Sequence, residues 1–91
     1  MKRNRTEQLI DILEQCKNGE GLKITHVSHK ANVDGKTAVS ALTFLTSKDL
    51  LEKLYFEKAK RPVYRTTKDG RWLVRLYREV EKALAIEGRI S

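Results

Sequence analysis

The sequence has one cysteine, one proline and no long apolar run. A lone Cys16 excludes an internal disulfide, and no stretch approaches the roughly 18 apolar residues that a membrane-spanning helix needs. The cations Lys2, Arg3 and Arg5 are not followed by the apolar segment of a secretory signal. We therefore expect a soluble, cytoplasmic protein that does not contact a membrane.

Patterns that would support catalysis or metal binding are also missing. The sequence contains no glycine-rich phosphate loop, no paired carboxylates and no nucleophile with a matching base. His26 and His29 lie three residues apart, but with one cysteine they do not complete a tetrahedral zinc set. We expect no enzyme and no metal or cofactor; no small-molecule ligand is evident, and ligand sensing stays open. We expect Cys16 to be a small core residue.

The composition is that of a small folded domain with a strong positive charge. Ninety-one residues, 40% of them hydrophobic, allow one modest core and one domain. Nineteen Lys and Arg against twelve Asp and Glu leave a net charge of +7. An excess of this sign and size favours a polyanionic partner, with nucleic acid first and an acidic membrane surface second.

The positive charge is concentrated in one part of the chain. Residues 48–68 hold seven Lys or Arg against three Asp or Glu, a net of +4. The first six residues contribute +3, and residues 7–20 contribute −3. The segment around residues 57–62 is therefore a candidate contact for a polyanion.

Hydrophobic periodicity and capping residues predict the order helix, short strand, helix, turn, helix, hairpin, helix. All four helices have an expected cap residue, and the first and the last also have an expected stop. The expected elements are a helix over 5–17 with Asn4 and Glu7 at capping-box spacing, stopped by residues 18–21; a strand over 22–24; a helix over 26–31 capped by Thr25; a helix over 35–48 capped by Asp34; strands over 50–56 and 63–66; and a helix over 68–87 capped by Thr67 and closed by Gly88.

Two short helices joined by a tight turn and followed by a basic hairpin predict a winged helix-turn-helix. The fold class is α+β and mainly helical. We expect residues 1–66 to form the DNA-binding head, residues 67–88 to complete the core and form a dimer interface, and residues 89–91 to form a tail.

The helix over 35–48 has an apolar face and an opposite polar face. Its apolar positions, spaced at about 100° per residue, anchor it on the two preceding helices. Its outer face carries short hydroxyl side chains that can enter a major groove. The expected recognition residues are Lys36, Thr37, Ser40, Thr43, Phe44 and Ser47; the expected wing residues are Lys58, Lys60 and Arg61; and the expected DNA-backbone contacts are Lys2, Arg3, Arg5 and His26.

Two segments of the chain resemble a known family. Residues 25–33, THVSHKANV, resemble the T-x-(I/V)-x-x-x-A-N-(L/V) segment of the small archaeal winged-helix DNA-binding proteins and predicted regulators of about ten kilodaltons. Residues 64–70, YRTTKDG, are similar to that family's Y-x-T-T-x-x-G entry into the last helix. The resemblance spans residues 7–84 and implies DNA binding by a dimer that forms through the long last helix.

Two positions depart from the family pattern. Asp49 stands where glycine is usual, so we expect it to adopt a left-handed backbone conformation at some cost. Ala38 replaces a leucine, which reduces the packing beneath the helix over 35–48.

The last helix carries more apolar surface than one neighbour can cover. One stripe contains Gly70, Leu73, Val74, Tyr77 and Leu84, and another contains Trp72, Leu76 and Ala83, with Val80 between them. Together they span about 200°, against the roughly 100° of a helix packed on one side. We expect Trp72, Leu76, Val80 and Ala83 to form a homodimer interface, with an antiparallel partner helix. In the alternative, the helix over 5–17 covers both stripes within a monomer.

These observations lead to two functional hypotheses from different classes. The first is a homodimer that binds double-stranded DNA, with modest sequence selectivity, as a transcriptional regulator or a nucleoid-associated chromatin protein. The second is a winged-helix module that binds an acidic protein partner. RNA binding through the same surface is a third possibility, disfavoured because no strand carries an expected aromatic platform.

Overall fold

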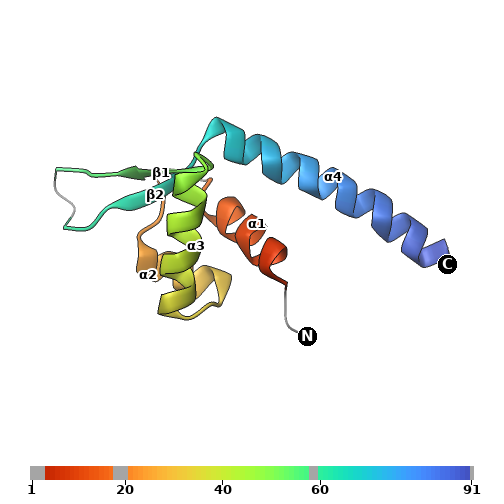
Figure 1. Ribbon diagram of the computed structural model, residues 1–91, viewed down its shortest axis with the longest axis horizontal. Coiled ribbons are helices and arrows are strands. Elements are labelled where there is room, and N and C mark those ends of the chain that lie inside the picture. The colour runs from red at the N-terminus through yellow and green to blue at the C-terminus, as the bar shows by residue number, and fades with distance from the viewer. Residues whose placement is uncertain (1–3, 18–20, 58–59, 91) are drawn as a thin grey trace.

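The computed structural model describes residues 4–17, 21–57 and 60–90, with side chains described as far as residue 84. Four helices and a two-stranded antiparallel hairpin form a mainly helical winged helix (Figure 1). The elements are α1 (Arg5–Gln15), α2 (Ile24–Ala31), α3 (Gly35–Ser47), β1 (Leu51–Leu54), β2 (Val63–Thr66) and α4 (Lys68–Ile90). The predicted fold class is confirmed, and the expected stop at residues 18–20 lies outside the described residues.

Helix α1 begins with the predicted capping box. The Asn4 side chain accepts a hydrogen bond from the backbone N–H of Glu7 at 2.8 Å and donates one to the Glu7 carboxylate at 3.2 Å. The helix ends at Gln15, two residues before the predicted end, with Cys16 as the C-cap.

The C-terminal end of α1 is tied to β2 and α4 through its last carbonyl groups. The Thr66 hydroxyl donates to the carbonyl of Leu13 at 2.6 Å, and the Thr66 backbone N–H donates to the carbonyl of Cys16 at 3.1 Å. The guanidinium of Arg71 donates to the carbonyl of Lys17 at 2.8 Å. Because helix carbonyls at this end have no partner within the helix, these bonds stabilise the junction of three elements.

Helix α2 begins earlier than predicted, and Thr25 does not cap it. The cap position is Lys23, and no side chain among the described residues bonds to the helix there. The expected strand over 22–24 is reduced to Leu22, which pairs with Tyr64 through two backbone hydrogen bonds of 2.9 and 2.8 Å. Thr25 was wrongly predicted as the cap because the extended segment ends at Leu22, two residues before its predicted end, and α2 begins at Ile24.

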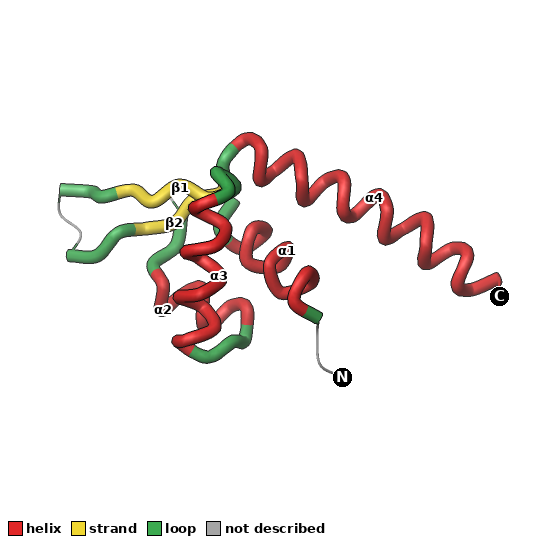
Figure 2. The backbone as a smooth tube through the Cα atoms, viewed as in Figure 1, coloured by secondary structure: helices red, strands yellow, loops and turns green. Residues whose placement is uncertain are grey.

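The turn from α2 to α3 has the predicted geometry (Figure 2). Asn32 ends α2 in the left-handed conformation, with φ of 54°. Asp34 then caps α3 by accepting a hydrogen bond from the backbone N–H of Thr37 at 2.7 Å.

The hairpin forms with shorter strands than predicted. Leu51 pairs with Thr66 and Leu54 pairs with Val63, so Tyr55 would stand opposite Pro62. Since proline has no backbone N–H to donate, the ladder stops there and β1 does not reach residue 56. At the start of β1, Asp49 adopts φ of 60°, as the departure from glycine predicted.

Helix α4 is capped as predicted but runs further. The Thr67 hydroxyl accepts a hydrogen bond from the backbone N–H of Gly70 at 3.1 Å. The expected stop at Gly88 was wrong, since the helix continues to Ile90. Glycine permits a left-handed turn but does not impose one, and no proline follows it to stop the helix.

The core lies where α1, α2 and α3 meet the base of the hairpin. Its largest fully buried side chains include Ile12, Leu13, Leu42, Leu45 and Leu51. Cys16 is also buried, as predicted, and burial raises the pKa of its thiol to about 12. The hairpin and α4 project from this core in opposite directions (Figure 1). Within the described residues, no helix is both long and apolar enough to cross a membrane.

We expect Thr66→Val to destabilise the chain by about 1–3 kcal/mol, because it leaves the buried Leu13 carbonyl without its donor. Thr66→Ser keeps the hydroxyl and should lose much less. Urea unfolding followed by circular dichroism measures both, and equal losses in the two variants would contradict this role of the hydroxyl.

Candidate nucleic-acid interface

Helix α3 has the predicted division into a buried face and an exposed face. Its buried residues are Ala38, Ala41, Leu42 and Leu45. Thr37 is half-buried and Phe44 is 42% exposed. The remaining predicted recognition residues are all exposed, namely Lys36, Ser40, Thr43 and Ser47.

The N-terminus of α3 is held by a charged cap. The hydrogen bond from the backbone N–H of Thr37 lowers the pKa of Asp34 below its ordinary value. The carboxylate is therefore ionised at neutral pH and lies at the positive end of the helix dipole. This cap fixes the start of the helix whose outer face the candidate interface uses.

A cleft of about 280 Å³ joins the C-terminal half of α3 to the hairpin. Thr43 and Ser47 line it from α3, and Lys53 and Tyr64 line it from the facing strands, with Thr46 also contributing. Lys53 and Tyr64 are paired residues of β1 and β2, so their side chains lie on the same face of the hairpin. The outer face of α3 and the hairpin therefore form one continuous surface.

Lys53 and Tyr64 were not predicted as site residues. The signal was present in the alternation of β1, because Lys53 lies two residues from Leu51, on the face that points toward α3. The Lys53 ammonium lies 5.6 Å from the ring centroid of Tyr55, and the neighbouring Tyr55 side chain raises the pKa of Lys53. Lys53 is therefore a permanent cation beside the cleft.

A second missed cation is Lys48, directly after α3. Its ammonium lies 5.8 Å from the ring centroid of Phe44, which is part of the exposed face. Its position four residues after Phe44 was the available signal, since side chains at that spacing meet on a helix.

The predicted wing and DNA-backbone residues lie in different parts of the molecule. Lys60 and Arg61 are exposed in the connection between β1 and β2, and His26 is exposed on α2. Arg5 is exposed at the start of α1, which lies on the far side of α3 from the hairpin (Figure 1). The structure therefore does not bring Arg5 together with the wing, and Lys2, Arg3 and Lys58 lie outside the described residues.

Helix α4 buries one of its two apolar stripes and exposes the other. Leu73, Val74 and Tyr77 pack against the core. On the other stripe Trp72 is 63% exposed, Leu76 45% and Val80 48%, and Ala83 is also exposed. The alternative in which α1 covers both stripes is therefore wrong for the described residues. Leu84 was assigned to the first stripe but is 62% exposed, because α4 extends beyond the head there.

A family model described as winged helix-turn-helix matches residues 2–85. The chain belongs to the winged helix-turn-helix family. The family's fold agrees with the architecture described above, and among curated proteins no sequence matches this chain.

Three solved structures share the winged helix-turn-helix fold with this chain. Sso10a-2, a DNA-binding protein from Sulfolobus solfataricus, is 23% identical with a TM-score of 0.74, and the match covers 96% of this chain and 90% of that one. FabT from Streptococcus pneumoniae, in complex with DNA, is 25% identical with a TM-score of 0.68 over 94% of this chain. PcaV, a transcriptional regulator from Streptomyces coelicolor in complex with its natural ligand, is 21% identical with a TM-score of 0.70 over 92% of this chain. The chain spans only 59% of FabT and 63% of PcaV.

We expect Asp34→Ala to destabilise the winged helix at pH 7. Because the pKa of Asp34 is lowered by folding, its contribution is present above the unfolded pKa and is lost as the pH falls through the folded one. The difference in melting temperature from the wild type should therefore shrink below about pH 4.

The matched control is Asp34→Asn, which keeps a cap acceptor without a titrating group. Thermal unfolding at pH 7 and pH 3 compares the three proteins. A gap between wild type and Asp34→Ala that is the same at both pH values would contradict the charged cap.

Proposed function

We propose that this chain binds double-stranded DNA as a homodimer and acts as a transcriptional regulator or a small chromatin protein. The observation that carries the proposal is the cleft in which Thr43 and Ser47 of α3 face Lys53 of the hairpin. A helix of short polar side chains beside a basic hairpin fits a major groove and the adjoining phosphate backbone.

In this proposal α3 enters the major groove with its outer face. The hydroxyls of Ser40 and Thr43 bond base edges, and Phe44 packs against thymine methyl groups. Lys36 and the N-terminus of α3 contact phosphate. Short hydroxyls without Arg, Asn or Gln on this face support modest sequence selectivity.

The hairpin supplies cations that contact the backbone or minor groove of the flanking DNA. The proposed contacts are Lys58, Lys60 and Arg61, joined by Lys53 from β1 and Lys48 after α3. His26 on α2 is a further proposed phosphate contact, as are Lys2, Arg3 and Arg5 at the N-terminus.

Proteins of the same fold support DNA as the partner. Sso10a-2 is described as DNA-binding, and FabT was solved in complex with DNA. The site contains hydroxyls and cations suited to a polyanion and serves binding rather than catalysis, so we propose a non-enzymatic protein of the nucleoid.

The dimer in this proposal forms through the exposed stripe of α4. Trp72, Leu76, Val80 and Ala83 recur over more than three turns of one helix, which is the spacing of a helix-packing face. A second copy of the same helix would cover them and place two heads on one duplex.

Replacing Lys60 and Arg61 together by Ala should weaken duplex binding across all DNA sequences. If about five of these cations in each subunit neutralise a phosphate, a wild-type dimer has an expected log-log salt slope of about −9, and four lost contacts should make it shallower by about 3–4. Fluorescence anisotropy with duplex DNA at several salt concentrations measures the slope.

The matched control for the wing is Lys68→Ala with Lys82→Ala, which removes two exposed cations from α4 and should leave the slope nearly unchanged. A wild-type slope shallower than about −2 would refute the DNA mechanism. Unchanged duplex affinity in the wing variant would instead favour an acidic protein partner.

Replacing Trp72 and Leu76 together by Ala should convert the dimer to a monomer without unfolding the head, because both side chains are exposed on α4. Light scattering should then report 10.5 kDa rather than twice that mass. Glu79→Ala, on an exposed polar position of the same helix, serves as the control. A dimer that persists in the double variant would remove α4 as the interface.

A further inference from the structure

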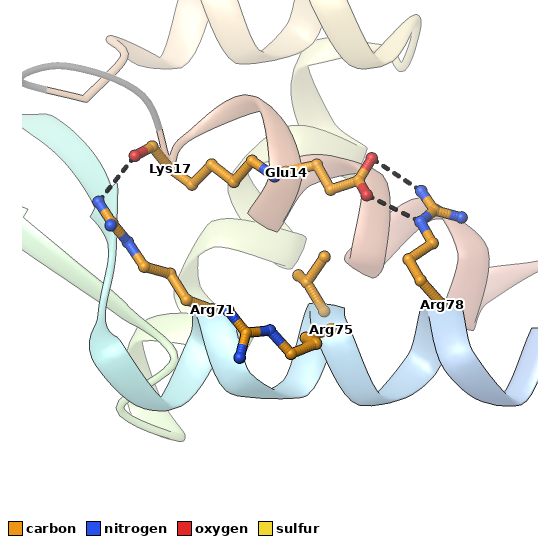
Figure 3. Close-up of a pocket in the computed structure, with 6 residues that line it drawn as sticks. Glu14, Lys17, Arg71, Arg75 and Arg78 are labelled. Carbon is orange, nitrogen blue, oxygen red and sulfur yellow. Dashed lines mark hydrogen bonds and ion pairs between the residues drawn. The ribbon is translucent and has the colours of Figure 1, made fainter.

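A cleft of about 380 Å³ separates the C-terminal half of α1 from the first turns of α4 (Figure 3). Its lining residues are Glu14, Lys17, Arg71, Val74, Arg75 and Arg78. Four of these six side chains are cations and one is a carboxylate, so the cleft has a net charge of +3. Neither the proposed recognition face nor the wing uses any of these residues.

Two arginines at the ends of the cleft are held in place. Arg78 donates two hydrogen bonds of 2.8 Å to the two carboxylate oxygens of Glu14 (Figure 3). This bidentate pair lowers the pKa of Glu14. At the other end, Arg71 donates one hydrogen bond to the carbonyl of Lys17, which leaves its remaining N–H groups available.

The third arginine, Arg75, lies between these two on α4. It is four residues from Arg71 and three from Arg78, so all three guanidinium groups project from one face of the helix. Arg75 is exposed and forms no hydrogen bond or ion pair with any residue that the structure describes. Like charges at this spacing repel each other, and the single carboxylate of the cleft is already engaged by Arg78.

We propose that this cleft binds a small oxyanion, a phosphate or phosphomonoester, between Arg75, Arg71 and Lys17. Planar guanidinium groups match the oxygens of phosphate, and a dianion compensates most of the charge of +3. The buried side chain of Val74 forms an apolar floor, which leaves room for a small substituent on the phosphate.

The geometry favours a small molecule over a DNA backbone as the source of the phosphate. The cleft is a recess between two helices on the side of the head toward α4, whereas the hairpin projects in the opposite direction (Figure 1). An oxyanion there would connect Lys17, just after the end of α1, to Arg75 of α4 and hold α4 against the head. This inference does not depend on DNA binding.

The test is calorimetric titration of the full chain with inorganic phosphate at pH 7.5 and fixed ionic strength. We expect one saturable site per chain. Arg75→Gln should weaken phosphate binding about tenfold through the loss of a charge-assisted contact. Lys82→Gln removes an equal charge from α4 outside the cleft, and its affinity should stay within about twofold of wild type.

Glu14→Gln is a second test, in which phosphate affinity should rise rather than fall. It removes the one carboxylate that lines the cleft and leaves Arg78 paired only with Glu81, so the net charge of the cleft rises to +4 and phosphate should bind several-fold tighter. A purely structural role for these residues predicts no such gain. Circular dichroism establishes whether this variant is folded, and Arg75→Gln alone decides the matter if it is not, because Arg75 is exposed.

Three outcomes would overturn the proposal. Phosphate binding that does not saturate, or that is equal in wild type and Arg75→Gln, would show no site in the cleft. Loss of phosphate binding in the Lys60→Ala/Arg61→Ala variant but not in Arg75→Gln would place the anion on the wing. Displacement of phosphate by duplex DNA, with an equal loss of duplex affinity in Arg75→Gln, would make the cleft a DNA surface.

Discussion

Strand β2 determines how the parts of this small protein are arranged. Its backbone pairs with β1 on one edge and with Leu22 on the other, and Thr66 binds two carbonyl groups at the end of α1. These bonds join segments that are distant in sequence, and they hold the hairpin against the end of α1. At the junction of α3 and β1, the backbone N–H of Leu50 donates to the carbonyl of Leu45 at 3.0 Å. Together with the junction between α3 and β1, they define the orientation of the hairpin relative to α3.

That orientation is what creates the candidate interface. The side chains of Lys53 and Tyr64 both line the cleft beside the C-terminal half of α3, because paired residues of an antiparallel ladder share a face. The same strand passes directly into α4 through the cap residue Thr67, whose hydroxyl also donates to the carbonyl of Asp49 at 2.7 Å. The positions of the hairpin, α3 and α4 relative to one another therefore depend on one short stretch of chain.

The features that could be predicted from the sequence are local. The caps at Asn4, Asp34 and Thr67 depend on side chains within three residues of the bonds they make, and the faces of α3 follow from its periodicity. The left-handed backbone of Asp49 was predictable because a glycine is usual at that place.

The features that the sequence analysis missed or misplaced are set by distant contacts. The early start of α2 follows from the bridge between Leu22 and Tyr64, which no local pattern reveals. The place of Lys53 in the α3 cleft follows from strand register, and the grouping of Arg71 and Arg75 with α1 follows from how α4 packs.

Helix α4 acts as a long lever whose inclination is set at one end. Its 23 residues span about 35 Å, so a tilt of about 5° at the head moves the far end by about 3 Å. In a pair joined along this helix, such a tilt would change the separation of the two wings by a comparable amount. The ion pair between Glu14 and Arg78 joins α4 to α1 about midway along the helix, so a change in this pair would alter the inclination of α4 against the head.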